Sequence, residues 1–231
     1  MRSELAEMFI EGARKAGYLQ TTFIGNNCKI DPTAIIGDNC CIGDNTIIRK
    51  NVVIGNNVTV GENCILGETP TMWGSDSDDE GFDKKLIIGD GCCFKPFVVV
   101  ERGFLRDSKI GNNCFFSSMC GISHDVNIGN NCLFFPRSVT YSNVTIGDNV
   151  RIYTDSIVLN DIIIGSNSVI YFKAFVKKSC KEGSFIVGED SDTLKEYCKK
   201  RNFLKHVSKT LQRIKNLEDT INGRTDKEHK R

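Results

Sequence analysis

This 231-residue chain has only three histidines, no long apolar run and almost no excess of either charge. Its 30 basic and 29 acidic residues nearly cancel, so no overall electric field attracts nucleic acid or a membrane surface. No segment approaches the ~18 consecutive apolar residues of a membrane span, and the N-terminal stretch contains acidic residues and lacks the apolar run of a signal peptide. We therefore expect a cytoplasmic protein with no membrane span and no nucleic-acid partner.

A six-residue repeat is what the chain has in abundance. Bulky apolar residues recur at every sixth position over residues 24–66, 88–100 and 110–176, and of 23 such positions only Thr140 departs. On an α-helix, at about 100° per residue, these residues would point in different directions, and a flat strand predicts a period of two. A prism of short strands explains the period, with one strand per hexad, three hexads per coil and the apolar residue pointing inward.

Glycine and asparagine mark the expected corners, in segments such as "IGNN", "IGDN" and "VGEN". A second inward position follows each apolar residue by four, and it must be small because three faces converge there. Eight of the eleven cysteines occupy it: Cys28, Cys40, Cys64, Cys92, Cys114, Cys120, Cys132 and Cys180. We interpret them as reduced, buried small hydrophobes rather than as disulfides or metal ligands.

From Phe23 to about Gly188 the chain carries the hexapeptide-repeat signature and resembles the left-handed parallel β-helix acyltransferases. The resemblance implies an all-β solenoid, a triangular prism with a short N-terminal helix and a C-terminal α-helix. We predict a helix or cap over residues 1–22, the β-helix over 23–188, and a helix with a flexible tail over 189–231. Two loops, 67–87 and 101–109, interrupt the repeat, and such loops tend to carry function.

His124 lies where other corners have glycine, aspartate or asparagine. Because one coil is eighteen residues, we expect His124, Ser142, Asn160 and Lys178 to form one column, at about 4.8 Å per coil. An imidazole that titrates near neutrality can take a proton from a hydroxyl or amine, and an ammonium group can meet phosphates. The alternative is that His124 is only a polar corner residue.

The segment "ISHDVNIGNNC" resembles the active-site strand of the UDP-N-acetylglucosamine acyltransferases of lipid A synthesis and of the sugar acetyltransferases. The resemblance implies that His124 is the general base, oriented either by Asp125 or by a carboxylate of another chain. "VVVERGF" resembles a strand of the lipid A enzymes that ends in His-Arg-Gly, with Glu101 at the histidine position and Arg102 next to it. Glu101, Arg102 and Trp73 of the first loop are our candidates for binding the acceptor substrate.

The segment "SVIYFKAFVKKSCKEGSFIVGED", which begins at Ser168, resembles the end of the hexapeptide acetyltransferases that use acetyl-CoA. The resemblance implies acetyl-CoA or another acyl-CoA as co-substrate, with its phosphates at Lys177 and Lys178. A long thioester donor would then lie along the column past Asn160 and Ser142, with its acyl group at His124.

Our leading hypothesis is a homotrimeric acyltransferase with active sites between prisms, which moves an acyl group from CoA to a hydroxyl or amino group of a sugar or nucleotide sugar. One alternative takes the acyl group from acyl carrier protein, as in lipid A synthesis. Another is a non-catalytic scaffold or assembly protein on the same fold. A zinc carbonic anhydrase needs three histidine ligands, and only His124 lies in the repeat, so we expect no metal.

Overall fold

The computed structural model describes residues 22–70, 83–188, 192–193, 195–203, 206–207, 209–213 and 215. The chain divides into two units, Met1–Ser191 and Asp192–Arg231. The N-terminal helix predicted for residues 1–22 falls almost wholly outside the described residues, as do Trp73 and most of the first loop.

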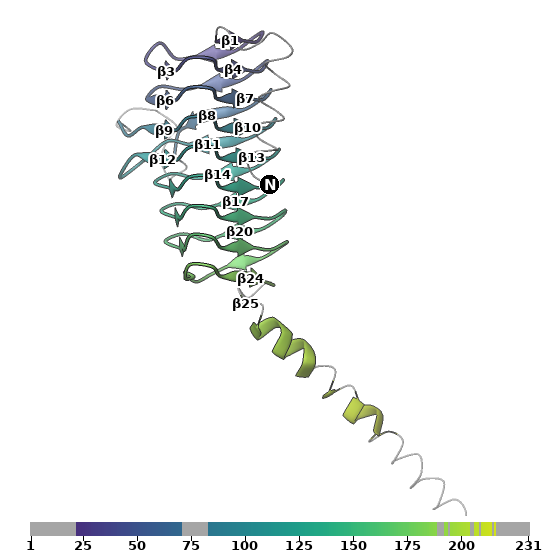
Figure 1. Ribbon diagram of the computed structural model, residues 1–231. Helices are drawn as coiled ribbons and strands as arrows, with labels where there is room; N and C mark the ends of the chain where they lie inside the picture. The colour runs from purple at the N-terminus through teal and green to yellow at the C-terminus, as the bar shows by residue number, and fades with distance from the viewer. Residues whose placement is uncertain are drawn as a thin grey trace, which may run out of the picture. The chain divides into compact units, whose positions relative to one another are not determined.

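Short parallel strands stack in three sheets and build the prism of the first unit (Figure 1). The first sheet contains β1 (Phe23–Ile24), β4 (Cys41–Ile42), β7 (Thr59–Val60), β10 (Cys93–Phe94), β13 (Phe115–Phe116), β16 (Leu133–Phe134), β19 (Arg151–Ile152), β22 (Val169–Ile170) and β24 (Phe185–Val187). The second contains β2 (Lys29–Ile30), β5 (Ile47–Ile48), β8 (Ile65–Glu68), β11 (Val99–Glu101), β14 (Gly121–Ile122), β17 (Val139–Thr140), β20 (Ile157–Val158) and β23 (Phe175–Val176). The third contains β3 (Ile35–Ile36), β6 (Val52–Ile54), β9 (Leu86–Ile88), β12 (Ser108–Ile110), β15 (Asn127–Ile128), β18 (Thr145–Ile146) and β21 (Ile163–Ile164).

Successive coils pair in register at the step that the repeat predicts. Ile24 pairs with Ile42, and Ile128 pairs with Ile146, in each case eighteen residues further on. Consecutive strands along the chain belong to three different sheets, so each coil visits the three faces in turn. The left-handed parallel β-helix predicted from the hexads is therefore confirmed.

Corners turn through left-handed backbone conformations. Eighteen non-glycine residues of the described chain have positive φ, and eleven of them are asparagine and three aspartate, the side chains that tolerate this region best. The exceptions are Phe97, Met119, Arg137 and Lys173, and all four lie at the corner between the first and second sheets. The asparagines that punctuate the sequence are thus corner residues, as predicted.

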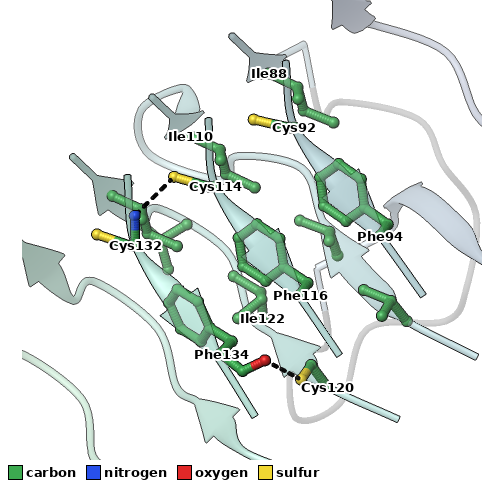
Figure 2. Close-up of a cluster of buried hydrophobic side chains, with 14 of the residues drawn as sticks. Ile88, Cys92, Phe94, Ile110, Cys114, Phe116, Cys120, Ile122, Cys132 and Phe134 are labelled. Atoms are coloured by element: carbon green, nitrogen blue, oxygen red, sulfur yellow. Dashed lines mark hydrogen bonds between the residues drawn. The ribbon is translucent and has the colours of Figure 1, made fainter. Parts of the chain in front are cut away.

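The inward positions form one continuous apolar core. Figure 2 shows Phe94, Phe116 and Phe134 of three successive coils stacked inside it, with ring centroids 4.8 Å and 4.6 Å apart. Thr140, which departs from the apolar series, is fully buried, and its hydroxyl has no hydrogen-bond partner. A buried hydroxyl without a hydrogen-bond partner destabilises the fold, so Thr140 lowers the stability of this coil.

The small inward cysteines are free and pack in this core, as predicted. Burial raises the pKa of the Cys40 and Cys64 thiols above its ordinary value. The protonated thiols donate to carbonyl oxygens of the next coil, Cys40 to Gly55 at 3.2 Å and Cys64 to Lys95 at 3.2 Å. Sulfur therefore fills the narrow corner and also satisfies a carbonyl group there.

The second unit contains β25 (Asp192–Thr193) and helical residues at 195–203, 206–207, 209–213 and 215. Thr193 and Glu196 form a capping box at the start of this helix: the Thr193 hydroxyl accepts from the Glu196 N–H at 3.2 Å, and the Glu196 carboxylate accepts from the Thr193 N–H at 2.9 Å. No helix in the described part of the chain is long and apolar enough to cross a membrane.

Candidate functional site

Both interruptions of the repeat leave the prism from the same corner, between the second and third sheets. The first lies between β8 and β9, the second between β11 and β12, and the next coil has His124 in the turn between β14 and β15. Two interruptions and the His124 turn thus lie at one edge in three successive coils. The stacking of coils explains how Glu101 and Phe104 of the second loop come to lie beside His124.

His124 and Asp125 form a hydrogen-bonded pair at this corner. The His124 Nδ1 lies 3.0 Å from Asp125 Oδ2, and the two side chains are 14% and 4% exposed. The backbone N–H of His124 donates to Glu101 Oε2 at 3.1 Å. The Phe104 ring meets the imidazole edge to face, with centroids 5.9 Å apart. The imidazole is therefore held from several directions and still reaches solvent.

Asp125 also anchors the second loop. Its Oδ1 accepts the backbone N–H groups of Phe104, Leu105 and Arg106, each at 2.9 Å. The Arg106 guanidinium donates through Nε and Nη2 to the Asp125 carbonyl oxygen, at 3.1 and 2.8 Å. Gly103 begins this turn, and a Cβ there would collide with the Arg106 carbonyl oxygen. One carboxylate thus holds both the imidazole and the loop.

These contacts lower the pKa of Asp125 below its usual range. Burial opposes the shift and is the largest single influence, but hydrogen bonds from the Arg106 and Phe104 N–H groups and from His124 together outweigh it. An ionised Asp125 accepts a hydrogen bond from an N–H at His124 Nδ1, and in that tautomer Nε2 is the nitrogen able to accept a proton. This is the arrangement that a general base requires.

Replacing Asp125 by asparagine should remove a pH-dependent part of the stability. Because its folded-state pKa is depressed, the carboxylate contributes stability above the unfolded value of about 3.9, and this is lost as pH falls through the folded pKa. We expect the wild type to exceed Asp125→Asn in free energy of unfolding at about pH 7, and the difference to shrink at about pH 3. Denaturant titrations at both values measure it.

The control for this prediction is Asp155→Asn, which removes a carboxylate from an exposed ion pair with Arg137 at 2.7 Å. Exposed pairs of this kind contribute little stability. A stability difference for Asp125→Asn that is equal at the two pH values, or no larger than that of Asp155→Asn, would contradict the conclusion that folding lowers the pKa of Asp125.

Glu101 and Arg102, two of the candidates for binding the acceptor substrate, lie in different surroundings. Glu101 ends β11 and contacts the His124 backbone. Arg102 is fully buried, and its Nη1 donates to the Gly67 carbonyl oxygen at 3.0 Å, beside the ion pair of Arg49 and Glu68. Burial and the neighbouring Arg49 lower the pKa of Arg102. In this structure Arg102 joins the bases of the two loops, and its contact with substrate stays a prediction.

The predicted column holds for three of its four members. The Asn143 N–H donates to the His124 carbonyl, and the Asp161 N–H to the Ser142 carbonyl, so the corners of His124, Ser142 and Asn160 lie one above another. The last corner is two residues shorter: Val158 pairs with Val176, but Ile164 pairs with Cys180. Lys178 lies within this shortened corner, and no described hydrogen bond stacks it on Asn160. Lys177, also exposed, places its Nζ 5.3 Å from the Phe175 ring centroid.

Sequence reasoning missed the part played by Phe104, Leu105 and Arg106. The interruption at 101–109 is visible as a break in the hexads, but nothing in its composition shows that three N–H groups converge on Asp125. Among the residues that the structure describes, no group of three or more His, Cys, Asp or Glu side chains is arranged to hold a metal ion.

A parallel β-prism with a buried hexad series and a histidine–aspartate pair on one corner defines the class, a hexapeptide-repeat β-helix. The model of the bacterial transferase hexapeptide family, six repeats, matches residues 21–56, 42–69 and 143–178. These segments cover less than half of the chain, and over them the chain is similar to that family. No curated protein sequence matches it.

Solved structures share the fold at low sequence identity. The UDP-N-acetylglucosamine acyltransferase from Campylobacter jejuni is 19% identical with a TM-score of 0.66, over 75% of this chain and 70% of that one. The enzyme of that name from Francisella novicida is 21% identical, TM-score 0.58, over 75% and 67%. LpxA, a UDP-N-acetylglucosamine acyltransferase from Bacteroides fragilis, is 23% identical, TM-score 0.55, over 75% and 72%.

Proposed function

We propose that the chain is an acyltransferase in which His124 is the general base. The observation that carries this is the His124–Asp125 pair, whose carboxylate is locked by three backbone N–H groups. Nε2 takes the proton of an acceptor hydroxyl or amino group as that group attacks the carbonyl carbon of a thioester. The tetrahedral oxyanion is stabilised by a backbone N–H and collapses, the C–S bond breaks, and the imidazolium returns its proton to the departing thiolate.

The acceptor that we propose is a sugar or nucleotide sugar. Support comes from the solved UDP-N-acetylglucosamine acyltransferases that share this fold. Glu101 supports it as well, because its carboxylate lies against the His124 backbone and can accept hydrogen bonds from sugar hydroxyl groups. The compartment that we propose is the cytoplasm.

We also propose a homotrimer with active sites between prisms. Support comes from the outer face of the second sheet, where apolar side chains stack in register in two runs on either side of Gly121: Ile47, Ile65 and Val99, then Val139, Ile157 and Phe175. An apolar face of this kind favours contact with another protein surface. This face adjoins the corner that has His124, so association there would bring a second prism beside the imidazole.

Titration with acetyl-CoA by calorimetry tests the proposed donor. We expect saturable binding that weakens in Lys178→Ala, because that variant removes an exposed cation that can meet the CoA phosphates, and that persists in His124→Ala. Failure to bind CoA, together with acylation from acyl carrier protein, would favour the carrier-dependent alternative. Absence of acyl transfer from either donor would favour the remaining hypothesis, a non-catalytic scaffold.

A further inference from the structure

A second feature lies on the third sheet, on the other side of the loop that contacts Asp125. It is an open depression of about 460 Å³, lined by Lys84, Leu105, Arg106, Asp107, Lys109, Asn127 and Thr145. Neither His124 nor Asp125 lines it. The depression is therefore separate from the imidazole, although Leu105 and Arg106 both line it and donate their N–H groups to Asp125.

The floor of the depression is polar where the rest of its column is apolar. Outward residues on the third sheet stack in register as Ile35, Val53, Ile87, Lys109, Asn127, Thr145 and Ile163. Only the three strands beneath the depression depart from isoleucine or valine. The floor therefore offers the amine of Lys109, the amide of Asn127 and the hydroxyl of Thr145 as hydrogen-bonding groups to a ligand in the depression.

The charge of the lining is positive. Lys84, Arg106 and Lys109 supply three cations against the single carboxylate of Asp107, whose Oδ1 accepts the Lys85 N–H at 2.9 Å. No carboxylate within the described ranges forms an ion pair with any of these three cations. Like charges around one depression repel, and a bound anion relieves that repulsion.

Arg106 joins the depression to the histidine–aspartate pair. Its Nε and Nη2 donate to the Asp125 carbonyl oxygen, and its own N–H donates to Asp125 Oδ1. These contacts fix the orientation of the guanidinium. Its remaining nitrogen, Nη1, has no hydrogen-bond acceptor among the described residues. An anion that draws Arg106 toward the third sheet would also move the loop that holds Asp125.

We propose that this depression binds a phosphate-bearing small molecule and that its occupancy is transmitted to His124 through residues 104–106. Phosphate oxygens are multiply charged acceptors, suited to two lysines and a guanidinium, and Asn127 and Thr145 supply further donors. The binding does not depend on acyl transfer, so it is measurable even if the proposed reaction is absent.

Inorganic pyrophosphate is the probe, titrated by calorimetry at about 0.15 M salt, where charges more than about 8 Å apart are screened. We expect saturable binding that is weakened by about fivefold or more in Lys109→Ala and in Lys84→Ala. Lys29→Ala is the matched control, because it removes the same charge from the outward face of β2, on another sheet. Thr145→Val keeps the shape of the floor and removes one donor, and a smaller loss is expected.

Transmission to His124 is read by NMR of selectively labelled histidine, with His124→Ala to assign its signal among the three histidines. Pyrophosphate should shift the His124 resonance in the wild type and in Lys29→Ala, but not in Lys109→Ala at the same concentration. Absence of saturable binding, or equal weakening in Lys29→Ala and Lys109→Ala, would overturn the site. Binding without a change at His124 would overturn the transmission.

Competition against bound pyrophosphate distinguishes the molecules that could bring a phosphate to the depression. Displacement by uridine diphosphate would assign the depression to the acceptor, and displacement by coenzyme A would assign it to the donor. If neither competes, the site belongs to a separate phosphorylated ligand.

Discussion

His124→Ala should lower the turnover number of acyl transfer by about 10²–10⁴-fold, the range that a positioned general base supplies. The structure gives the reason: Asp125 Oδ2 lies 3.0 Å from Nδ1, and Nε2 is the remaining basic nitrogen. Alanine removes the proton acceptor but leaves Asp125 with its three N–H donors, so the loop should keep its conformation. Steady-state kinetics with the acceptor found by a substrate screen measure the effect.

The pH profile separates this role from a structural one. The acid limb of the wild-type rate reports protonation of the base, so His124→Gln should lose that limb as well as most of the rate. His206→Ala is a matched control on the second unit, where the imidazole lies 2.9 Å from the Asn202 carbonyl oxygen on the surface. Wild-type turnover in His124→Ala, or a retained acid limb in His124→Gln, would show that the base lies elsewhere.

Phe116→Ala should lower the free energy of unfolding by about 3–5 kcal/mol. Phe116 is fully buried and stacks on Phe94 on one side and Phe134 on the other, so alanine leaves a cavity between two rings that belong to neighbouring coils (Figure 2). The neighbouring coils are hydrogen-bonded on both sides and can collapse little into that space. Denaturant unfolding at one fixed protein concentration measures the loss, since association would otherwise contribute.

Phe115→Ala is the matched control for this substitution. The two phenylalanines are neighbours on β13, but Phe115 points to the outer face and is only half-buried. Truncation there removes the same atoms without opening an internal cavity, so a clearly smaller loss is expected. A loss for Phe116→Ala of about 1 kcal/mol or less, or one equal to that of Phe115→Ala, would contradict the account of the core.

The repeat predicted most of the fold because each hexad contains its own strand, its inward residue and its corner. Local choices therefore add up to the global architecture without long-range information. The sequence also singles out His124, because histidine departs from the corner pattern, and the structure pairs it with Asp125, although their catalytic roles stay predictions. The loop contacts on Asp125 Oδ1 were not, because backbone N–H groups have no sequence signature and their direction depends on the whole turn.

Two further differences have the same origin. Arg102 is a candidate substrate ligand because of the resemblance of its strand, and that role stays a prediction; what the sequence did not show is that its side chain is buried against the Gly67 carbonyl. Lys178 follows His124 by three times eighteen residues, yet the final corner is two residues shorter than the others. The sequence does not show this shortening, because the hexads end there. Sequence period predicts register only while the period lasts.

The stacking of coils also determines where the molecule would open first. Each coil hydrogen-bonds only to its two neighbours, so fraying begins at an end coil and proceeds one coil at a time. Ile24, an inward residue of the first coil, is 48% exposed, whereas Ile122, just before His124, is 2% exposed. With complete coils on both sides, the His124 turn keeps its geometry when either end loosens, and the ends can vary in length without disturbing the chemistry between them.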